Sequence, residues 1–397
     1  MNARDTRLLT RRSLLGGLAA TASLPAVASA SSLGATLGLH LDLPTSSVEG
    51  GVYIGANENP LGPCEEACAQ LSKLIPMTGR YDRGVEKKVT DLFAQQNDLP
   101  ASHVGIYAGS FLPLHYAGLA FASPTRSIVA ASPTFDAMFY KPDRTPIAPM
   151  RQVPVDAQRR IDVKAMVAAD GQAGIIYLCN PNNPTGTILS RDEIGYVIKN
   201  KPAGSIVIVD EAYIHYSDAE TSIPFVKQGA DILVSRTFSK IYGMAGLRCG
   251  VLMGRPDLLA KITPYGANPM PTPALVAAYA SLQQPALIAE RRRYNNGTRE
   301  ATFAWLKQNG YEYLPSQTNF FMLKVNRPGG QVSAALAREK VFISGARAQM
   351  EDWVRVSVGT PEEMRKFQVA LQKVMSQPAT AHVGELMTHD SQTWASC

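Results

Sequence analysis

Short apolar runs recur along the middle of the chain, and each run ends in polar or turn-forming residues. Continuous runs at 174–180, 205–213 and 231–237 have the length and composition of strands that are covered on both faces. Two earlier segments, 103–110 and 127–135, show the same change from strand to turn. The pattern predicts a series of buried strands whose carboxyl ends carry the polar side chains.

Helical segments separate these strands. Ser190 and Glu193 have the spacing of a capping box and open a predicted helix over 192–200. Another apolar run, 246–254, follows the third strand. Repeated strand–helix units predict an α/β fold with a large, doubly wound, mostly parallel sheet, and ligands of such sheets bind beyond the carboxyl ends of the strands.

The pattern changes after about residue 268. A long helix over 291–310 is followed by three short strands and by a last helix that begins at Pro361. The strands are expected at 320–325, 340–345 and 354–360. This part of the chain predicts a second, smaller α+β domain.

The first 30 residues have the character of an export signal. The stretch "TRRSLL" (10–15) precedes a weakly apolar, Gly- and Ser-interrupted segment and a small-residue "ASA" at 28–30. This order is typical of a twin-arginine signal that is cleaved near Ala30, and the segment is too short and broken for a membrane span. We therefore expect a periplasmic protein that is exported folded.

Charge and cysteine content narrow the possible functions. The formal charge of +6 falls to +3 without residues 1–30, and no dense basic run remains, which disfavours nucleic-acid binding. The five cysteines form neither a disulfide framework nor a zinc pattern. The expected organisation is a signal (1–30), an N-terminal arm (31–75), a large domain (76–267), a small domain (268–377) and a loose tail (378–397).

Polar groups follow successive predicted strands in a fixed order. "NPNNPTG" (180–186) follows the first of the three strands, and Asp210, Glu211 and Tyr213 follow the next. Lys240 and the other polar residues of "SRTFSKIYGMAGLRCG" (235–250) follow the third. Each group alone is typical of a turn, a helix cap or a solvated surface, but their order along one sheet edge favours a common site.

One chemistry uses all of these groups. A lysine among other cations and apolar residues loses its proton more readily and can form an imine with an aldehyde cofactor, which arginine cannot do. Pyridoxal phosphate also needs an anion site, a carboxylate for its ring nitrogen and donors for its ring oxygen. Ser110, Thr237, Ser239 and Arg248 can hold the phosphate, Asp210 can pair with the ring nitrogen, and Asn183 and Tyr213 can reach the ring oxygen.

The chain resembles a known enzyme family. The motifs "NPNNPTG", "VDEAYIHY", "SRTFSKIYGMAGLRCG" and "VRVSVGT", in this order, are similar to those of the fold-type I, class I/II aminotransferases, and in particular to the histidinol-phosphate aminotransferase branch. The resemblance runs from about Val52 to Lys373 and implies a homodimeric enzyme with pyridoxal 5'-phosphate as cofactor. It implies transfer of an amino group between an amino acid or related amine and a 2-oxo acid.

The resemblance also implies roles for single residues. Lys240 corresponds to the Schiff-base lysine and proton shuttle, and Phe135 to the aromatic residue that stacks on the ring. Gly109, Ser110 and the backbone of Phe111 match the phosphate-binding turn at a helix start.

Other matches concern the partner subunit and the substrate. Tyr81 matches a tyrosine that reaches the phosphate from the second subunit, which is the basis for the expected homodimer. Arg355 matches the arginine that clamps the substrate's carboxylate or phosphate, and Asn59 lies in the substrate-side arm "NENPLGP".

Two positions depart from the family pattern. Phe111 and Leu112 replace a usual acidic pair after the phosphate turn. Ser344 stands where the histidinol-phosphate branch has a second arginine, although Arg347 is nearby. Together with the export signal, this favours a substrate other than histidinol phosphate, with histidinol phosphate itself as the alternative.

Three rival functions stay open at this point. A decarboxylase or β-lyase could use the same lysine and cofactor. A nucleotide-dependent oxidoreductase would need a glycine-rich turn, which "YAGSFLPLHYAG" (107–118) does not supply. A periplasmic binding protein would need no reactive lysine. An absorption band of the cofactor that is lost in Lys240→Ala would separate an aminotransferase from both the oxidoreductase and the binding protein.

Overall fold

The computed structural model describes residues 48–81, 84–266, 269–347 and 349–378. The predicted signal (1–30) lies outside these residues. So do residues 31–47 of the predicted arm and residues 379–397 of the predicted tail. None of the helices in the described ranges is long and apolar enough to cross a membrane.

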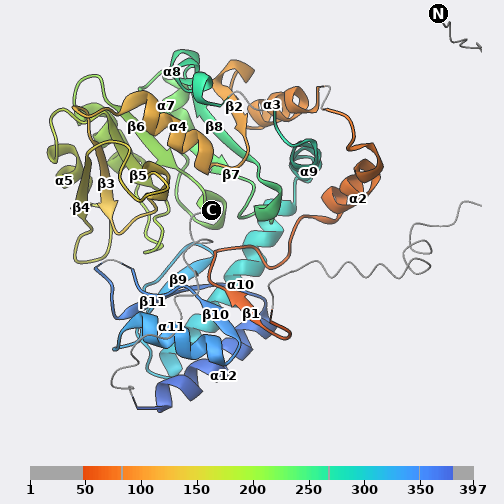
Figure 1. Cartoon of the computed structure of the whole chain (residues 1–397), viewed down its shortest axis with the longest axis vertical. Coiled ribbons are helices and arrows are strands. Elements are labelled where there is room, and N and C mark those ends of the chain that lie inside the picture. Colours follow the sequence, from red (N-terminus) through yellow and green to blue (C-terminus); the bar gives the residue numbers. More distant parts are fainter. Residues whose placement is uncertain (1–47, 82–83, 267–268, 348, 379–397) are drawn as a thin grey trace, which may run out of the picture. The chain divides into compact units, whose positions relative to one another are not determined.

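A seven-stranded sheet forms the centre of the larger region (Figure 1). Its strand order is β2-β8-β7-β6-β5-β3-β4, and every neighbouring pair is parallel except the two that involve β8. The strands are β2 (Val104–Tyr107), β3 (Ile128–Ser132), β4 (Met150–Pro154), β5 (Ile175–Cys179), β6 (Ile206–Asp210), β7 (Ile232–Thr237) and β8 (Gly250–Gly254). This sheet confirms the predicted α/β class and the predicted mostly parallel arrangement.

Helices cover both faces of this sheet because alternate strand residues enter two different cores. Along β5, Ile176 and Leu178 pack into one core with α3, α5, α6, α7 and α9, while Ile175 and Tyr177 pack into another with α4 and α8. The helices are α2 (Glu65–Leu74), α3 (Val85–Gln96), α4 (Phe111–Phe121), α5 (Val163–Ala168), α6 (Arg191–Asn200), α7 (Ile223–Lys227), α8 (Pro256–Ile262) and α9 (Thr272–Leu282). Short 3₁₀ helices lie at η1 (Ile75–Met77), η2 (Ala101–His103), η3 (Ala137–Phe139), η4 (Ile214–Tyr216), η5 (Ala245–Leu247) and η6 (Thr263–Tyr265).

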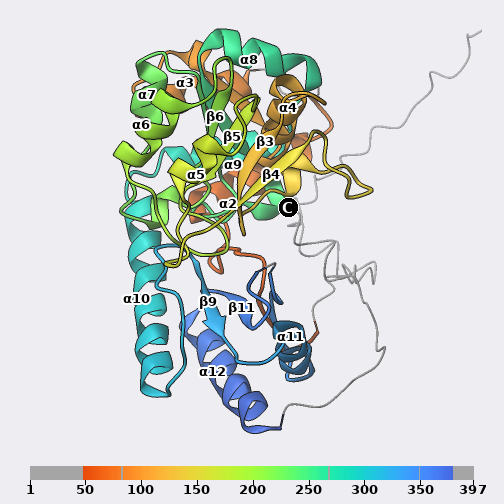
Figure 2. The same ribbon diagram turned by 90° about the vertical axis from the view of Figure 1, so that its left-hand side faces the viewer.

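A smaller region has its own apolar core, built on two short sheets. β9 (Phe320–Lys324) pairs antiparallel with β11 (Trp353–Ser357), and β1 (Val52–Ile54) pairs parallel with β10 (Val341–Ile343). The helices are α10 (Leu287–Gln308), α11 (Gly329–Arg338) and α12 (Pro361–Ser376). Figure 2 shows α10 running along the molecule to the side of these strands. The chain segment that contains β1 therefore joins a region that is otherwise C-terminal.

Local sequence signals explain most element boundaries. The capping box at Ser190 and Glu193 opens α6 as predicted, and Thr360 with Glu363 forms a second box at α12. The strand predicted at 205–213 ends at Asp210, which frees the following residues for the site. The run at 246–254 becomes a strand only from Gly250, and β4 was not anticipated because it alternates weakly at a sheet edge.

Candidate active site

Lys240 lies just beyond the carboxyl end of β7, and its Nζ donates to the carbonyl oxygen of Ala56 at 3.1 Å. Burial lowers the pKa of Lys240 to about 8, and the positive charge of Arg355 acts in the same direction. Glu58 is the acid that opposes this shift most strongly. The lysine is therefore close to losing its proton at mildly alkaline pH, as a nucleophilic amine requires.

Asp210 ends the neighbouring strand β6 and is almost completely buried. Its Oδ2 accepts a hydrogen bond from the Tyr177 hydroxyl at 3.0 Å, whereas its Oδ1 is buried without a partner among the described residues. Burial raises the pKa of Asp210 to about 6, against the hydrogen bond from Tyr177, which lowers it. An unpaired carboxylate oxygen of this kind calls for a cationic or N–H partner.

Asn183 and Tyr213 stand beside these two groups. The Asn183 Oδ1 accepts from Arg355 at 2.8 Å, which leaves the amide NH₂ to donate elsewhere. The Tyr213 hydroxyl accepts from Asn57 Nδ2 at 3.1 Å and keeps its own proton to donate. Lys240 Nζ lies 5.8 Å from the centre of the Tyr213 ring. Both residues thus offer a donor at the same side of the site.

A cradle that could hold an anion lies at the start of α4. Gly109 has a φ of 85°, and a Cβ there would overlap Arg248 Nη2, so only glycine lets the guanidinium approach this turn. The Arg248 Nη1 donates to Ser239 Oγ at 3.4 Å, and the Ser239 N–H donates to Thr237 Oγ1 at 3.0 Å. Ser110 is the residue before the helix, whose N-terminus favours a negative ligand.

Arg355 is buried on β11 and reaches the same site from the smaller region. Its Nη2 donates to the Gly55 carbonyl at 2.6 Å, and its Nε is buried without a partner in the described part of the chain. Burial lowers the pKa of Arg355, and repulsion from Arg347 adds to the effect. A guanidinium held in this way, which has no acid among its hydrogen-bond partners in the described ranges, is suited to a substrate anion.

Arg347 lies close to Arg355 even though the expected second arginine position is occupied by Ser344. Its Nη2 donates to Ser344 Oγ at 2.7 Å, and backbone bridges join Ser344 to Arg355. Burial lowers the pKa of Arg347, while the nearby Tyr213 raises it. The Arg347 guanidinium is therefore within electrostatic reach of the Tyr213 side chain. The serine thus anchors an arginine that comes from three residues further along.

The remaining predicted residues have more varied positions. Phe135 follows β3 and packs against the core on the α4 side of the sheet, and Phe111 begins α4. Asn59 donates to the Ile241 carbonyl at 3.0 Å and accepts from the Leu61 N–H, so its polar atoms hold the arm beside the lysine segment. Tyr81 is 87% exposed, and in the part of the chain that the structure describes it makes no contact with the other predicted site residues.

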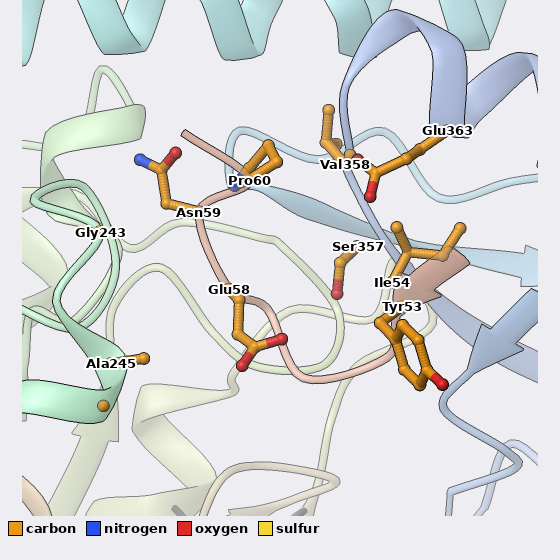
Figure 3. A pocket seen from close by; sticks show the side chains of 12 residues that line it. Tyr53, Ile54, Glu58, Asn59, Pro60, Gly243, Ala245, Ser357, Val358 and Glu363 are labelled. Carbon is orange, nitrogen blue, oxygen red and sulfur yellow. The ribbon is translucent and has the colours of Figure 1, made fainter. Parts of the chain in front are cut away.

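The arm also lines a pocket of about 280 Å³ next to the lysine segment. Figure 3 shows Glu58 between Ala245 on one side and Ser357 on the other, with Asn59 near Gly243. Because Glu58 raises the pKa of Lys240, this pocket is in electrostatic contact with the reactive amine. It is a natural place for the part of a substrate that extends beyond the reacting atoms.

Sequence reasoning missed Tyr177, and it placed Asn57 and Glu58 in the substrate-side arm "NENPLGP" without giving either a contact. Asn57 donates to Tyr213 and its backbone N–H donates to Ser357 Oγ at 2.8 Å, so it joins the two regions. The signal for Tyr177 was present as the one hydroxyl-bearing residue in the apolar run 174–179. The motif marked Asn57 and Glu58 as part of the arm, but their contacts could not be predicted, because these depend on how the arm folds back onto residues far along the chain.

Comparison with known proteins agrees with this geometry. Residues 54–371 match the family described as "Aminotransferase class I and II". A histidinol-phosphate aminotransferase of Symbiobacterium thermophilum is 31% identical over 333 residues, which cover 82% of this chain and 91% of that protein. Histidinol-phosphate aminotransferase 2 of Pseudomonas aeruginosa is 32% identical over 334 residues, covering 82% and 89%. The crystal structure of the Sinorhizobium meliloti histidinol-phosphate aminotransferase in complex with pyridoxal-5'-phosphate has a TM-score of 0.73 at 22% identity, covering 82% of this chain and 90% of that one, which supports the fold.

Lys240, Asp210 and the turn at Gly109 lie at strand ends of a mostly parallel sheet, where such sheets bind their ligands. The chain belongs to the class I and II aminotransferase family. It is therefore an enzyme, as the sequence predicted.

Proposed function

We propose that this chain is a pyridoxal 5'-phosphate-dependent aminotransferase in which Lys240 binds the cofactor and carries the transferred proton. The observation that carries this proposal is the partly buried Lys240 amine, whose pKa is lowered to about 8, near Asp210, whose Oδ1 is buried without a partner among the described residues. Family membership supplies the reaction class and the cofactor. The roles of the single residues are inferred from their contacts.

The residues present fit the cofactor at each of its polar groups. The buried Asp210 Oδ1 lacks a partner among the described residues and suits a protonated ring nitrogen. The Gly109 turn, which a Cβ would fill, and the Arg248 guanidinium suit a phosphate. The free NH₂ of Asn183 and the hydroxyl of Tyr213 suit a ring oxygen.

In the reaction, bound pyridoxal phosphate supplies an aldehyde that accepts the substrate's amino group and a ring that withdraws electrons from the α carbon. Lys240 Nζ, unprotonated above about pH 8, takes a proton from the α carbon and returns it elsewhere. Asp210 keeps a negative charge beside the ring. Tyr213 and Asn183 would orient the ring through their donor groups.

Arg355 selects the substrate by its anionic group. Its guanidinium is fixed by Asn183 and Gly55, and its Nε is buried without a partner among the residues that the structure describes. Holding the substrate's carboxylate here keeps that group away from bond cleavage, which favours transamination over decarboxylation. The substrates are thus an amino donor and a 2-oxo acid.

The test is to load purified protein with pyridoxal phosphate and to compare wild type with Lys240→Ala and with Lys307→Ala, an exposed lysine on α10. Wild type and Lys307→Ala should show the same absorption band near the visible edge and form a keto acid from an amino donor. Lys240→Ala should lose the band and lower turnover on the order of 10⁴-fold. Release of carbon dioxide or ammonia instead of keto acid would overturn transamination.

Two substrate classes compete for this site. The relatives and the position of Arg347 beside Arg355 favour histidinol phosphate, because two guanidiniums suit a phosphate dianion. The predicted export signal and Ser344 in place of an arginine favour another amine, which is the alternative we prefer. An assay with histidinol phosphate and 2-oxoglutarate decides, since turnover at ordinary enzyme rates would contradict our preference.

We also propose a homodimer, on the basis of exposed residues at the end of the arm and just after it. Tyr81 is 87% exposed, and Ile75 and Met77 are 62% and 59% exposed in the same segment. A second copy that covers these side chains would bury apolar surface and bring Tyr81 to the partner's phosphate cradle. Light scattering should report twice the chain mass, and Tyr81→Phe should weaken cofactor binding severalfold; a monomer would contradict this proposal.

The proposed location is the periplasm. It is supported by the "TRRSLL" stretch and the "ASA" at 28–30, which lie outside the described residues. Residues 1–30 fused to a folded reporter should direct its export. Replacing Arg11 and Arg12 with lysine should block it; export that does not depend on these arginines would refute the twin-arginine assignment.

A further inference from the structure

Tyr177 places a hydroxyl group in the middle of an apolar core. It lies on β5, is 0% exposed, and packs in the core between the sheet and helices α4 and α8. The ring of Phe139 meets it edge to face, with ring centres 5.2 Å apart. A phenylalanine would fill the same space without burying a polar group, so the packing alone does not account for a phenol.

The hydroxyl donates to Asp210 Oδ2 at 3.0 Å. The pairing of β5 with β6 explains this contact, because Cys179 lies opposite Asp210 and Tyr177 is two residues earlier on the same face. Two residues of a strand span about 6.6 Å, a distance that a tyrosine side chain covers when it leans along the strand. A shorter hydroxyl at this position would not reach the carboxylate.

Because of this hydrogen bond, the two oxygens of the Asp210 carboxylate have different surroundings. Oδ2 is held by Tyr177, while Oδ1 is buried and has no partner in the described ranges. A donor to the ionised carboxylate also favours the charged form, against the burial that raises the pKa of Asp210. The phenol thus fixes both the direction and the charge of the acid that faces the cofactor ring.

We propose that Tyr177 is a positioning residue, which orients Asp210 through its hydroxyl and keeps it ionised so that the free oxygen pairs with the protonated ring nitrogen of the cofactor. This inference rests on the proposed function. It predicts that the hydroxyl matters only for a ligand that carries this nitrogen and only when Asp210 is present.

The experiment measures equilibrium binding of two ligands to the apo-protein: pyridoxal phosphate and its 1-deaza analogue, in which carbon replaces the ring nitrogen. Tyr177→Phe should weaken pyridoxal phosphate binding about tenfold and leave the analogue within about twofold of wild type. Tyr242→Phe is the matched control, because Tyr242 is also buried and packs against Phe238, and it should change neither affinity.

A second comparison separates positioning from a general effect on folding. In an Asp210→Ala background, Tyr177→Phe should no longer change pyridoxal phosphate affinity, because the two residues act as a unit. Equal weakening of both ligands by Tyr177→Phe, or an unchanged effect in the Asp210→Ala background, would overturn the inference. If wild type and Tyr177→Phe bind pyridoxal phosphate with the same affinity, the inference is refuted but the proposed function is not. Wild type that binds neither ligand would refute the proposed function and the inference with it.

Discussion

The two sides of the active site are built in different ways. On the sheet side, Asp210 and Lys240 stand at the ends of neighbouring strands, so their separation follows from strand pairing. On the opposite side, Arg355 comes from β11 and meets Gly55 and Asn183, which are 300 and 172 residues away in the sequence. The sheet side is set by regular secondary structure, whereas the arginine side depends on the arm and the smaller region folding together.

The two sides also differ in their proposed chemical roles. Strand ends fix the residues that face the cofactor, whose shape does not change from one substrate to another. The loop before β11 supplies Arg347, the arm supplies Glu58, and β11 itself supplies Arg355; in the proposed function these residues face the substrate. We therefore expect substitutions on the sheet side to lower turnover with every substrate, and substitutions on the arginine side to change which substrate is used.

Asp210→Asn should have the largest effect of the comparisons below. It should lower kcat on the order of 10³-fold with any amino donor, because it removes the charge that stabilises the protonated ring. Kinetics with two chemically different donors checks this, and a loss confined to one donor would contradict a sheet-side role.

The same substitution, which should lower kcat, should make the apo-protein more stable. Burial raises the pKa of Asp210 to about 6 from 3.8, so the folded state disfavours the ionised form, and stability falls as pH rises between these values. Asp210→Asn should therefore raise the free energy of unfolding at pH 8, with a much smaller gain at pH 4. Urea unfolding at both pH values tests this, and a loss of stability at pH 8 would be contrary evidence.

Arg355→Gln should lower kcat/KM about 100-fold for substrates that carry a carboxylate or phosphate, through the loss of a two-pronged contact. Arg347→Gln should lower kcat/KM only about fivefold for a monoanionic donor. A larger loss for a dianionic donor would sharpen the comparison, since it would give Arg347 a separate anionic group to bind. Equal losses for a neutral amine would show that neither arginine selects the substrate.

The sheet side could be predicted from the sequence because strand ends can be read from apolar runs. The runs ending near Cys179, Asp210 and Thr237 correctly gave β5, β6 and β7, and with them a shared edge. The role of Tyr177 was missed because an apolar run does not tell which face a residue occupies until the register with β6 is known.

The arginine side was harder for a physical reason. Arg347 reaches Arg355 through a hydrogen bond to Ser344, a position where an arginine was expected, and a spacing rule does not capture such an exchange. Asn57 and Glu58 act through an arm that pairs with β10 some 290 residues later (Val52 with Val341). Long-range contacts of this kind carry no local pattern.

Gly109→Ala should weaken pyridoxal phosphate binding about tenfold. A Cβ at this position, with a φ of 85°, would both strain the turn and displace Arg248 from the cradle. Gly330→Ala on α11 is the control, because a Cβ there meets nothing within 4 Å. If the two variants bind the cofactor equally well, the cradle is not the phosphate site.

The mildest effect concerns pH. The pKa of Lys240 is lowered to about 8, so the unprotonated amine, and with it the rate at which apo-protein takes up pyridoxal phosphate covalently, should rise with pH and be half-maximal near pH 8. Stopped-flow absorption between pH 6 and 10 measures this. A midpoint near 10.5, the value of an ordinary lysine, would show that the site does not activate the amine.

The central claim is that a single lysine joins the cofactor. Borohydride reduction of the pyridoxal phosphate-loaded protein, followed by peptide mass spectrometry, tests it directly. We predict one labelled peptide, with the added mass on Lys240. No added mass with excess cofactor, or a label on another lysine, would contradict the account.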